Sequence, residues 1–246
     1  FRPVAGVWRA AWGQNRTIHE ENDANERVRE NTTTDVTNWP GANVKVLAEN
    51  PGGGYNYSGG AYFPFTDGTL YYIAPSFQGT STSTGHFKNL QTVLLRCDDE
   101  STVSETWTRV GVIGDIWPLG PPVKMDDGNW IFCGGDTNAR PHVMISQGDN
   151  ITAPWTRITI PVPNGWPIPA YNEVNIMVYG STVQAIIRPP TAGAAYTAIS
   201  KNYGRNWRRA RADGMIIQNK KPSAIVLSNG VHVVVNYRSD EARALQ

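Results

Sequence analysis

The chain has 246 residues, 40% of them hydrophobic, and its 22 basic and 21 acidic residues give a formal net charge of +1. A chain of this length and composition can bury a core, and because neither charge sign forms a block, we expect no nucleic-acid partner. The longest apolar runs, such as VHVVVNY at 231–237, are too short to cross a bilayer. We therefore expect a globular protein with no membrane span.

Turn signals follow one another along the chain between short apolar runs. They are TDGTLYYIA at 66–74, the Asp127-Gly128 turn, YGSTVQAII at 179–187 and SNGVHVVVN at 228–236. Asp-Gly and Asn-Gly between β-branched or aromatic residues are strong hairpin signals. Trp residues close the segments between these hairpins, at Trp39, Trp107, Trp155 and Trp207.

Each repeat is therefore interpreted as four short antiparallel strands in ~50 residues, the pattern of a propeller blade. One blade cannot bury both faces of its sheet, so several must stack. We predict an all-β fold, a β-propeller with about four and a half blades visible. We interpret residues 1–246 as a single propeller domain, incomplete and part of a six- or seven-bladed propeller.

The segment SKNYGRNW at 200–207 carries a family resemblance. It resembles the Asp-box, S-x-D-x-G-x-x-W, of the sialidase-like propellers, with Asn202 in place of the Asp. Weaker copies precede Trp39, Trp107 and Trp155. The resemblance implies a sialidase-like fold in which this motif is a structural turn between the third and fourth strands of a blade.

Propeller geometry brings the start of each inner strand and the end of each second strand to one face. Glu173 and Arg188 occupy those positions in one hairpin, NEVNIMVYGSTVQAIIR at 172–188, and should be neighbours. An Arg partner favours the ionised form of a Glu. In the sialidases that this arrangement resembles, a Glu polarises a nucleophilic Tyr and three Arg bind the substrate carboxylate.

The same positions supply the other candidates. The catalytic candidates are Glu173, His86 and Tyr237, and the substrate-binding candidates are Arg188, Arg238, Arg140, Asn172 and Asp136. Tyr237 is chosen by its position alone, since the sequence offers no clear counterpart of the family's nucleophilic Tyr. Guanidinium groups bind carboxylates in bidentate fashion, which suits an anionic sugar.

We expect a carbohydrate-active enzyme that cleaves a glycosidic linkage of an acidic sugar, as a sialidase-like hydrolase. Two alternatives stay open. The chain also resembles propellers that act as polysaccharide lyases on uronate polymers, in which His86 would serve as the base beside an Arg. A non-catalytic propeller that only binds glycan or protein would use the same side chains as ordinary loop residues.

The expected partner is an acidic oligosaccharide or polysaccharide, and no cofactor is implied. Asp98-Asp99 and Asp126-Asp127 leave room for a structural Ca²⁺, although turns explain both pairs. No metal site is expected at Cys97 and Cys133, which we interpret as buried thiols or one bridge. Four Asn-x-Ser/Thr sequons and a start at Phe1 favour a processed protein that is secreted or periplasmic.

Overall fold

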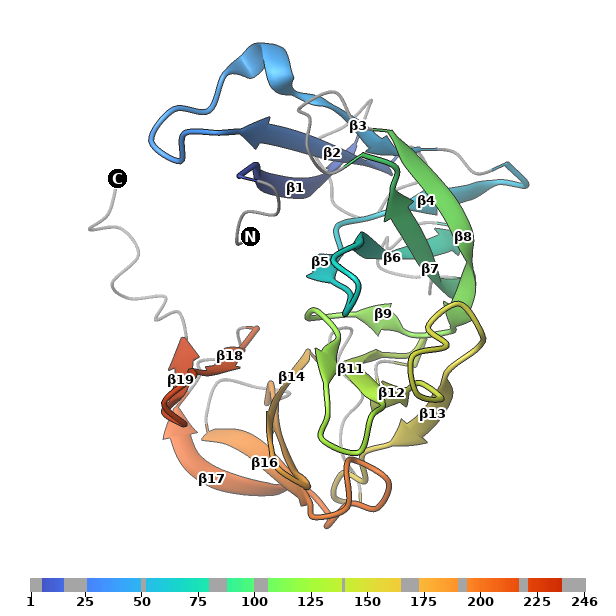
Figure 1. Ribbon diagram of the computed structural model, residues 1–246. Coiled ribbons are helices and arrows are strands. Elements are labelled where there is room, and N and C mark those ends of the chain that lie inside the picture. Colours follow the sequence, from blue (N-terminus) through green and yellow to red (C-terminus); the bar gives the residue numbers. More distant parts are fainter. Residues whose placement is uncertain are drawn as a thin grey trace. The chain divides into compact units, whose positions relative to one another are not determined.

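Antiparallel strands make up almost all regular structure in the computed structural model (Figure 1). It describes residues 6–15, 26–49, 52–79, 88–99, 106–138, 140–164, 173–189, 194–216 and 221–235. The helix in these ranges is one 3-10 turn, η1 (Gly41–Asn43). No helix in them is long and apolar enough to cross a membrane. The all-β prediction is confirmed.

Contacts divide the chain into two compact units. The first is Phe1–Pro121 with Thr152–Pro154, and the second is Pro122–Ile151 with Trp155–Gln246. The division leaves the single-domain interpretation of residues 1–246 a prediction.

The first unit holds two antiparallel sheets. One runs in the order β1 (Trp8–Asn15), β2 (Glu26–Thr33), β3 (Lys45–Ala48). The other runs in the order β4 (Tyr55–Tyr57), β6 (Leu70–Gln78), β7 (Lys88–Cys97), β8 (Trp107–Gly114), and β5 (Ala61–Pro64) also pairs with β6. Gly60 lies between β4 and β5, and its backbone is so close to the Ile73 carbonyl that a Cβ would clash. Strand β9 (Trp117–Pro118) follows, and its Trp117 ring stacks on Phe77 at 5.3 Å.

The second unit repeats a four-stranded antiparallel sheet twice. The first sheet is β10 (Val123–Lys124), β11 (Trp130–Gly135), β12 (Pro141–Ile145), β13 (Thr156–Thr159). The second is β14 (Val174–Tyr179), β15 (Thr182–Ile187), β16 (Ala194–Ser200), β17 (Arg211–Ile216), drawn in orange in Figure 1. The red hairpin of β18 (Ser223–Val226) and β19 (His232–Val235) ends the described chain. Successive four-stranded sheets are the predicted blades.

The four predicted hairpins are confirmed, because each has its glycine where the turn needs a positive φ. Gly68, Gly128, Gly180 and Gly230 have φ values of 92°, 86°, 54° and 81°. They connect β5 to β6, β10 to β11, β14 to β15 and β18 to β19. Glycine adopts this conformation without the steric cost that a side chain would impose.

The turn from Ser200 to Trp207 is held by its own polar groups. Ser200 Oγ accepts from the Gly204 N–H at 3.0 Å, and Asn202 Oδ1 accepts from the Asn206 N–H at 2.9 Å. The Trp207 indole donates to the Gly204 carbonyl at 2.7 Å. Tryptophan closes two other turns in the same way, with Trp39 donating to Val36 and Trp155 to Ile151. This shared bond explains why three of the four repeats end on Trp, whereas the Trp107 indole donates to the distant Glu30 carboxylate.

Buried apolar side chains fill each unit. In the first, Val28, Tyr62, Leu70, Tyr72 and Leu95 belong to one core cluster. In the second, Met177, Ile186 and Ala195 pack against the β18–β19 hairpin.

The cysteine and sequon predictions can be compared with this burial. Cys97 and Cys133 are buried thiols that form no disulfide, so the thiol interpretation is right and the bridge is not formed. Two sequon asparagines, Asn31 and Asn56, are buried, whereas Asn150 is exposed. Asn150 is therefore a better glycan acceptor in the folded chain than either of the other two.

Candidate functional site

Glu173 and Arg188 form an ion pair at one end of the β14–β15 hairpin. Arg188 Nη1 lies 2.7 Å from Glu173 Oε2, and the Arg188 N–H donates to the Glu173 carbonyl at 2.8 Å. The register follows from the turn at Gly180, which pairs Val174 with Ile187 and places the residues beyond them side by side. The predicted contact is confirmed. Its role in a site stays a prediction.

This pair is partly exposed. The side chains of Arg188 and Glu173 keep 19% and 23% of their accessible surface. A charge pair in this environment is less screened than one on open surface, yet solvent still reaches it. The arrangement can therefore present a guanidinium to a small anion.

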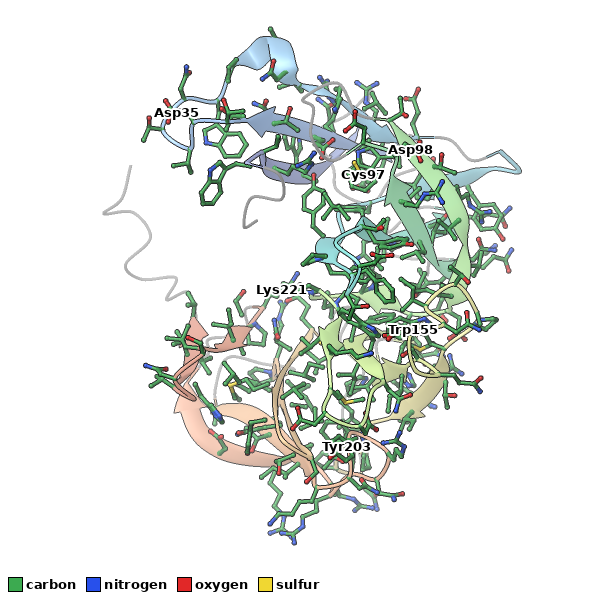
Figure 2. All side chains as sticks on the ribbon, in the orientation of Figure 1. Asp35, Cys97, Asp98, Trp155, Tyr203 and Lys221 are labelled. Atoms are coloured by element: carbon green, nitrogen blue, oxygen red, sulfur yellow. The ribbon has the colours of Figure 1, made fainter. Side chains whose placement is uncertain are left out.

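Strand β11 and the segment before β18 contact the start of β14. Cys133 Sγ, on β11, donates to the Val174 carbonyl at 3.3 Å, and Asn175 Nδ2 donates to the Pro222 carbonyl at 3.5 Å. Burial raises the pKa of the Cys133 thiol to about 12, although the Lys221 ammonium acts in the opposite direction. Lys221, labelled in Figure 2, lies two residues before β18 and is exposed. It adds a second cation to this end of the unit.

Asp136 closes the β11–β12 turn. Its Oδ1 accepts the N–H groups of Asn138 and Arg140, both at 2.9 Å, and its Oδ2 lies 3.1 Å from His142 Nε2. Burial acts to raise the pKa of Asp136, but the bonds from His142, Arg140 and Asn138 outweigh it and lower the pKa. These contacts are those of a turn residue. The binding roles predicted for Asp136 and for the exposed Arg140 stay predictions.

The other four candidates lie outside the described residues: His86, Asn172, Tyr237 and Arg238. The structure thus brings together Glu173 and Arg188 among the eight predicted residues, and it joins Asp136 to the backbone of Arg140.

Sequence reasoning missed His142. Its ring is 2% exposed and lies between the Asp136 carboxylate and Thr159 Oγ1, which is 3.2 Å from Nδ1. Asp136 and His142 flank one short hairpin connection, which is the sequence signal that could have paired them. Because the ring is buried, it is suited to hold Asp136 in place.

The described residues contain no group of three or more His, Cys, Asp or Glu side chains that could hold a metal ion. The aspartates considered for Ca²⁺ have partners within the protein. Asp98 Oδ2 accepts from Thr106 at 3.1 Å and from Thr108 at 2.8 Å, and Asp127 Oδ2 lies 2.7 Å from Arg205 Nη1. These contacts support the turn interpretation of both.

No family model and no curated protein matches the chain. Solved structures of sialidases do match it. The Hadza microbial sialidase Hz136 is 14% identical, with a TM-score of 0.65, and the match covers 94% of this chain and 50% of that protein. The NanB sialidase of Streptococcus pneumoniae is 10% identical, with a TM-score of 0.66 and coverage of 97% and 56%. The Trypanosoma rangeli sialidase is 11% identical, with a TM-score of 0.62 and coverage of 94% and 42%.

The chain thus spans about half the length of these proteins. At 10 to 14% identity the likeness is one of fold. The predicted sialidase-like β-propeller fold is confirmed.

Proposed function

Given its sialidase-like β-propeller fold, we propose that this protein is a glycoside hydrolase that cleaves the linkage of an acidic sugar. The observation that carries the proposal is the Glu173–Arg188 ion pair. Two further observations support the proposal. Both residues lie at strand ends, and both are partly exposed, so a ligand can contact them.

Arg188 would bind the carboxylate of the sugar. A guanidinium carries five N–H donors in a planar fork, so it can donate to the Glu173 carboxylate and to a sugar carboxylate at the same time. The bond to Glu173 fixes the orientation of this fork before substrate arrives, and a positioned donor needs less reorganisation on binding. Lys221, on the same end of the unit, would add attraction for an anion without bidentate geometry.

Glu173 would act on a tyrosine nucleophile, for which Tyr237 is the candidate. A carboxylate beside a phenol accepts its proton as the phenolic oxygen attacks the anomeric carbon, and the bond to the aglycone breaks as the aglycone oxygen takes up a proton from a water molecule. Water then releases the sugar from the tyrosine. His142 is too deeply buried to take part.

Secretion or a periplasmic location belongs to the same proposal. A polymeric or cell-surface glycan is met outside the cytoplasm, and the exposed Asn150 sequon is compatible with that environment.

The test is hydrolysis of sialosides and of uronate-ended oligosaccharides by the purified protein. We expect turnover of one acidic class and none of a matched neutral glycoside. Arg188→Lys keeps the charge but loses the fork, so kcat/KM should fall by at least about tenfold, equivalent to ~1.4 kcal/mol. Arg96→Lys is the control, because Arg96 is an exposed arginine of the first unit paired with Asp98.

Each other outcome has a defined meaning. An unsaturated product, detected by its ultraviolet absorbance, would identify a lyase instead. Saturable binding of the acidic sugar without any product would identify a binding propeller. Unchanged turnover in Arg188→Lys would remove this residue from the site and overturn the proposal.

A further inference from the structure

A groove lies at the end of the second unit that carries the Ser200–Trp207 turn. Its volume is about 310 Å³, and its lining residues are Ile199, Lys201, Asn202, Asn206, Trp207 and Arg208. This volume is at the low end of small-molecule sites, enough for one sugar ring but not for an oligosaccharide. The lining combines an aromatic ring, two amides and two cations.

The groove is on the opposite end of its sheet from Arg188. Ser200, at the end of β16, pairs with Val183 near the start of β15, whereas Arg188 follows the end of β15. Figure 2 shows Tyr203, in the turn, and Lys221 at opposite ends of the second unit. The length of β15 separates the two places by ~20 Å, so the groove is distinct from the Glu173–Arg188 pair.

Positive charge is concentrated here. The segment KNYGRNWRRAR at 201–211 contains five cations and no acidic residue, which corrects the expectation that neither charge sign forms a block. Lys201, Arg208, Arg209 and Arg211 are all exposed. Arg205 has a structural role, since it pairs with Asp127 at 2.7 Å and lies over the Tyr203 ring.

The lining groups suit a sugar that carries a carboxylate. Trp207 is half-buried and lines the groove, so its indole can pack against the apolar side of a pyranose ring, while the cations attract the acid group. The bonds described for Asn202 use its amide oxygen within the turn, so its NH₂ end can donate to sugar hydroxyls.

We propose that this groove binds one acidic sugar unit of a polysaccharide, as an accessory site separate from the Glu173–Arg188 pair. The choice of a glycan over another polyanion rests on the proposed function. The remainder of the polymer would pass over Arg209 and Arg211, at the start of the edge strand β17. A polymer held at two places gains effective concentration, whereas a short substrate does not.

The test uses the double variant Lys201→Gln/Arg208→Gln and two probes, polygalacturonate and polysialate. We expect the Kd for at least one polymer to rise about tenfold or more, because each charge-assisted bond contributes strongly to binding. Dextran, a neutral polymer, should not bind. The control Lys88→Gln/Arg96→Gln removes the same charge from exposed residues of the first unit, and its Kd should change by less than about twofold.

The outcomes separate this site from the proposed catalytic one. Kinetics on a short substrate should be unchanged in Lys201→Gln/Arg208→Gln, and polymer binding should survive in Arg188→Lys. Loss of polymer binding in Arg188→Lys alone would place the polymer at that pair and overturn the accessory site. Failure of both polymers to bind, an equal loss in the control, or tighter binding of duplex DNA that the double variant abolishes would also overturn it.

Discussion

The Arg9–Glu30 pair of the first unit and the Arg188–Glu173 pair of the second unit differ in what surrounds them. In the first unit Arg9 Nε lies 3.8 Å from Glu30 Oε1, and both side chains are fully buried. In the second unit Arg188 and Glu173 approach to 2.7 Å and keep about a fifth of their surface exposed. The same two residue types are thus used in a closed environment and in an open one.

Glu30 is surrounded by protein groups from other strands. The Tyr62 hydroxyl donates to Oε1 at 2.7 Å, the Trp107 indole donates to Oε2 at 3.1 Å, and Lys45 Nζ lies 3.8 Å from Oε2. Burial, followed by the nearby Glu30 carboxylate, raises the pKa of Tyr62 well above its usual value. Glu30 therefore joins β2 to β5 and β8, and its role is to hold two sheets together.

The comparison teaches that an ion pair becomes a site candidate through its surroundings. A carboxylate that already accepts bonds from the protein in a dry environment cannot be reached by a ligand. A pair at the end of a hairpin, with a backbone bond to fix it, can be reached.

The largest expected effect is on stability, from Glu30→Gln. The amide keeps the shape but leaves the Arg9 charge buried without its counter-ion, which should cost ~3–5 kcal/mol of unfolding free energy. Urea unfolding followed by tryptophan fluorescence measures it. Glu173→Gln is the matched control and should cost less than ~1 kcal/mol, as for exposed pairs. Similar losses for both variants would contradict the distinction between the two pairs.

Exchanging Arg for Lys in each of the two pairs distinguishes an effect on activity from an effect on stability. Arg188→Lys should lower kcat/KM on the acidic substrate by at least about tenfold, or ~1.4 kcal/mol, with little change in unfolding. Arg9→Lys should do the reverse, with reduced stability and unchanged KM at a temperature where the variant stays folded. If Arg9→Lys lowered activity without destabilising the protein, the buried pair would have to be assigned to function.

Local chemistry made much of the fold and one site contact predictable. Gly68, Gly128 and Gly180 lie in hairpin turns, and the type of each turn depends on only two or three adjacent residues. The Glu173–Arg188 contact follows from the last of these turns, because hairpin register fixes which residues face each other.

The Glu30 cluster could not be predicted in the same way. Its members come from five strands between residues 9 and 107, and no local pattern indicates that Tyr62 and Trp107 converge on one carboxylate. The close approach of Gly60, between β4 and β5, to the Ile73 carbonyl was also missed. Such features depend on tertiary packing.

A smaller effect is expected at the turn that borders the proposed groove. Asn202→Ala removes the acceptor for the Asn206 N–H and the Ser200 hydroxyl, which should cost about 1 kcal/mol of unfolding free energy. Asn206→Ala is the control: it changes an exposed side chain of the same groove and should shift stability by less than ~0.5 kcal/mol. Thermal unfolding compares the two. Equal losses would mean that the turn does not depend on Asn202.

The smallest effect, at Asp136, should depend on pH. The bonds around Asp136 lower its pKa below the ordinary value of 3.8 in the folded protein. A lowered pKa means that the folded state favours the ionised form, so the stabilisation is fully present above pH 3.8 and is lost as the pH falls through the lowered pKa. Asp136→Asn should therefore be less stable than the parent at pH 7, and the difference should shrink toward zero on acidification below pH 3.8.

Asp98 of the first unit provides the comparison for Asp136. Hydrogen bonds, first from Thr108, lower the pKa of Asp98 too, but its carboxylate is mostly solvated, so Asp98→Asn should give a smaller difference at pH 7. Urea midpoints of both variants, measured from pH 7 down to the acid limit of the folded state, make the test. A difference for Asp136→Asn that stays constant with pH would show that the turn requires its shape and not its charge.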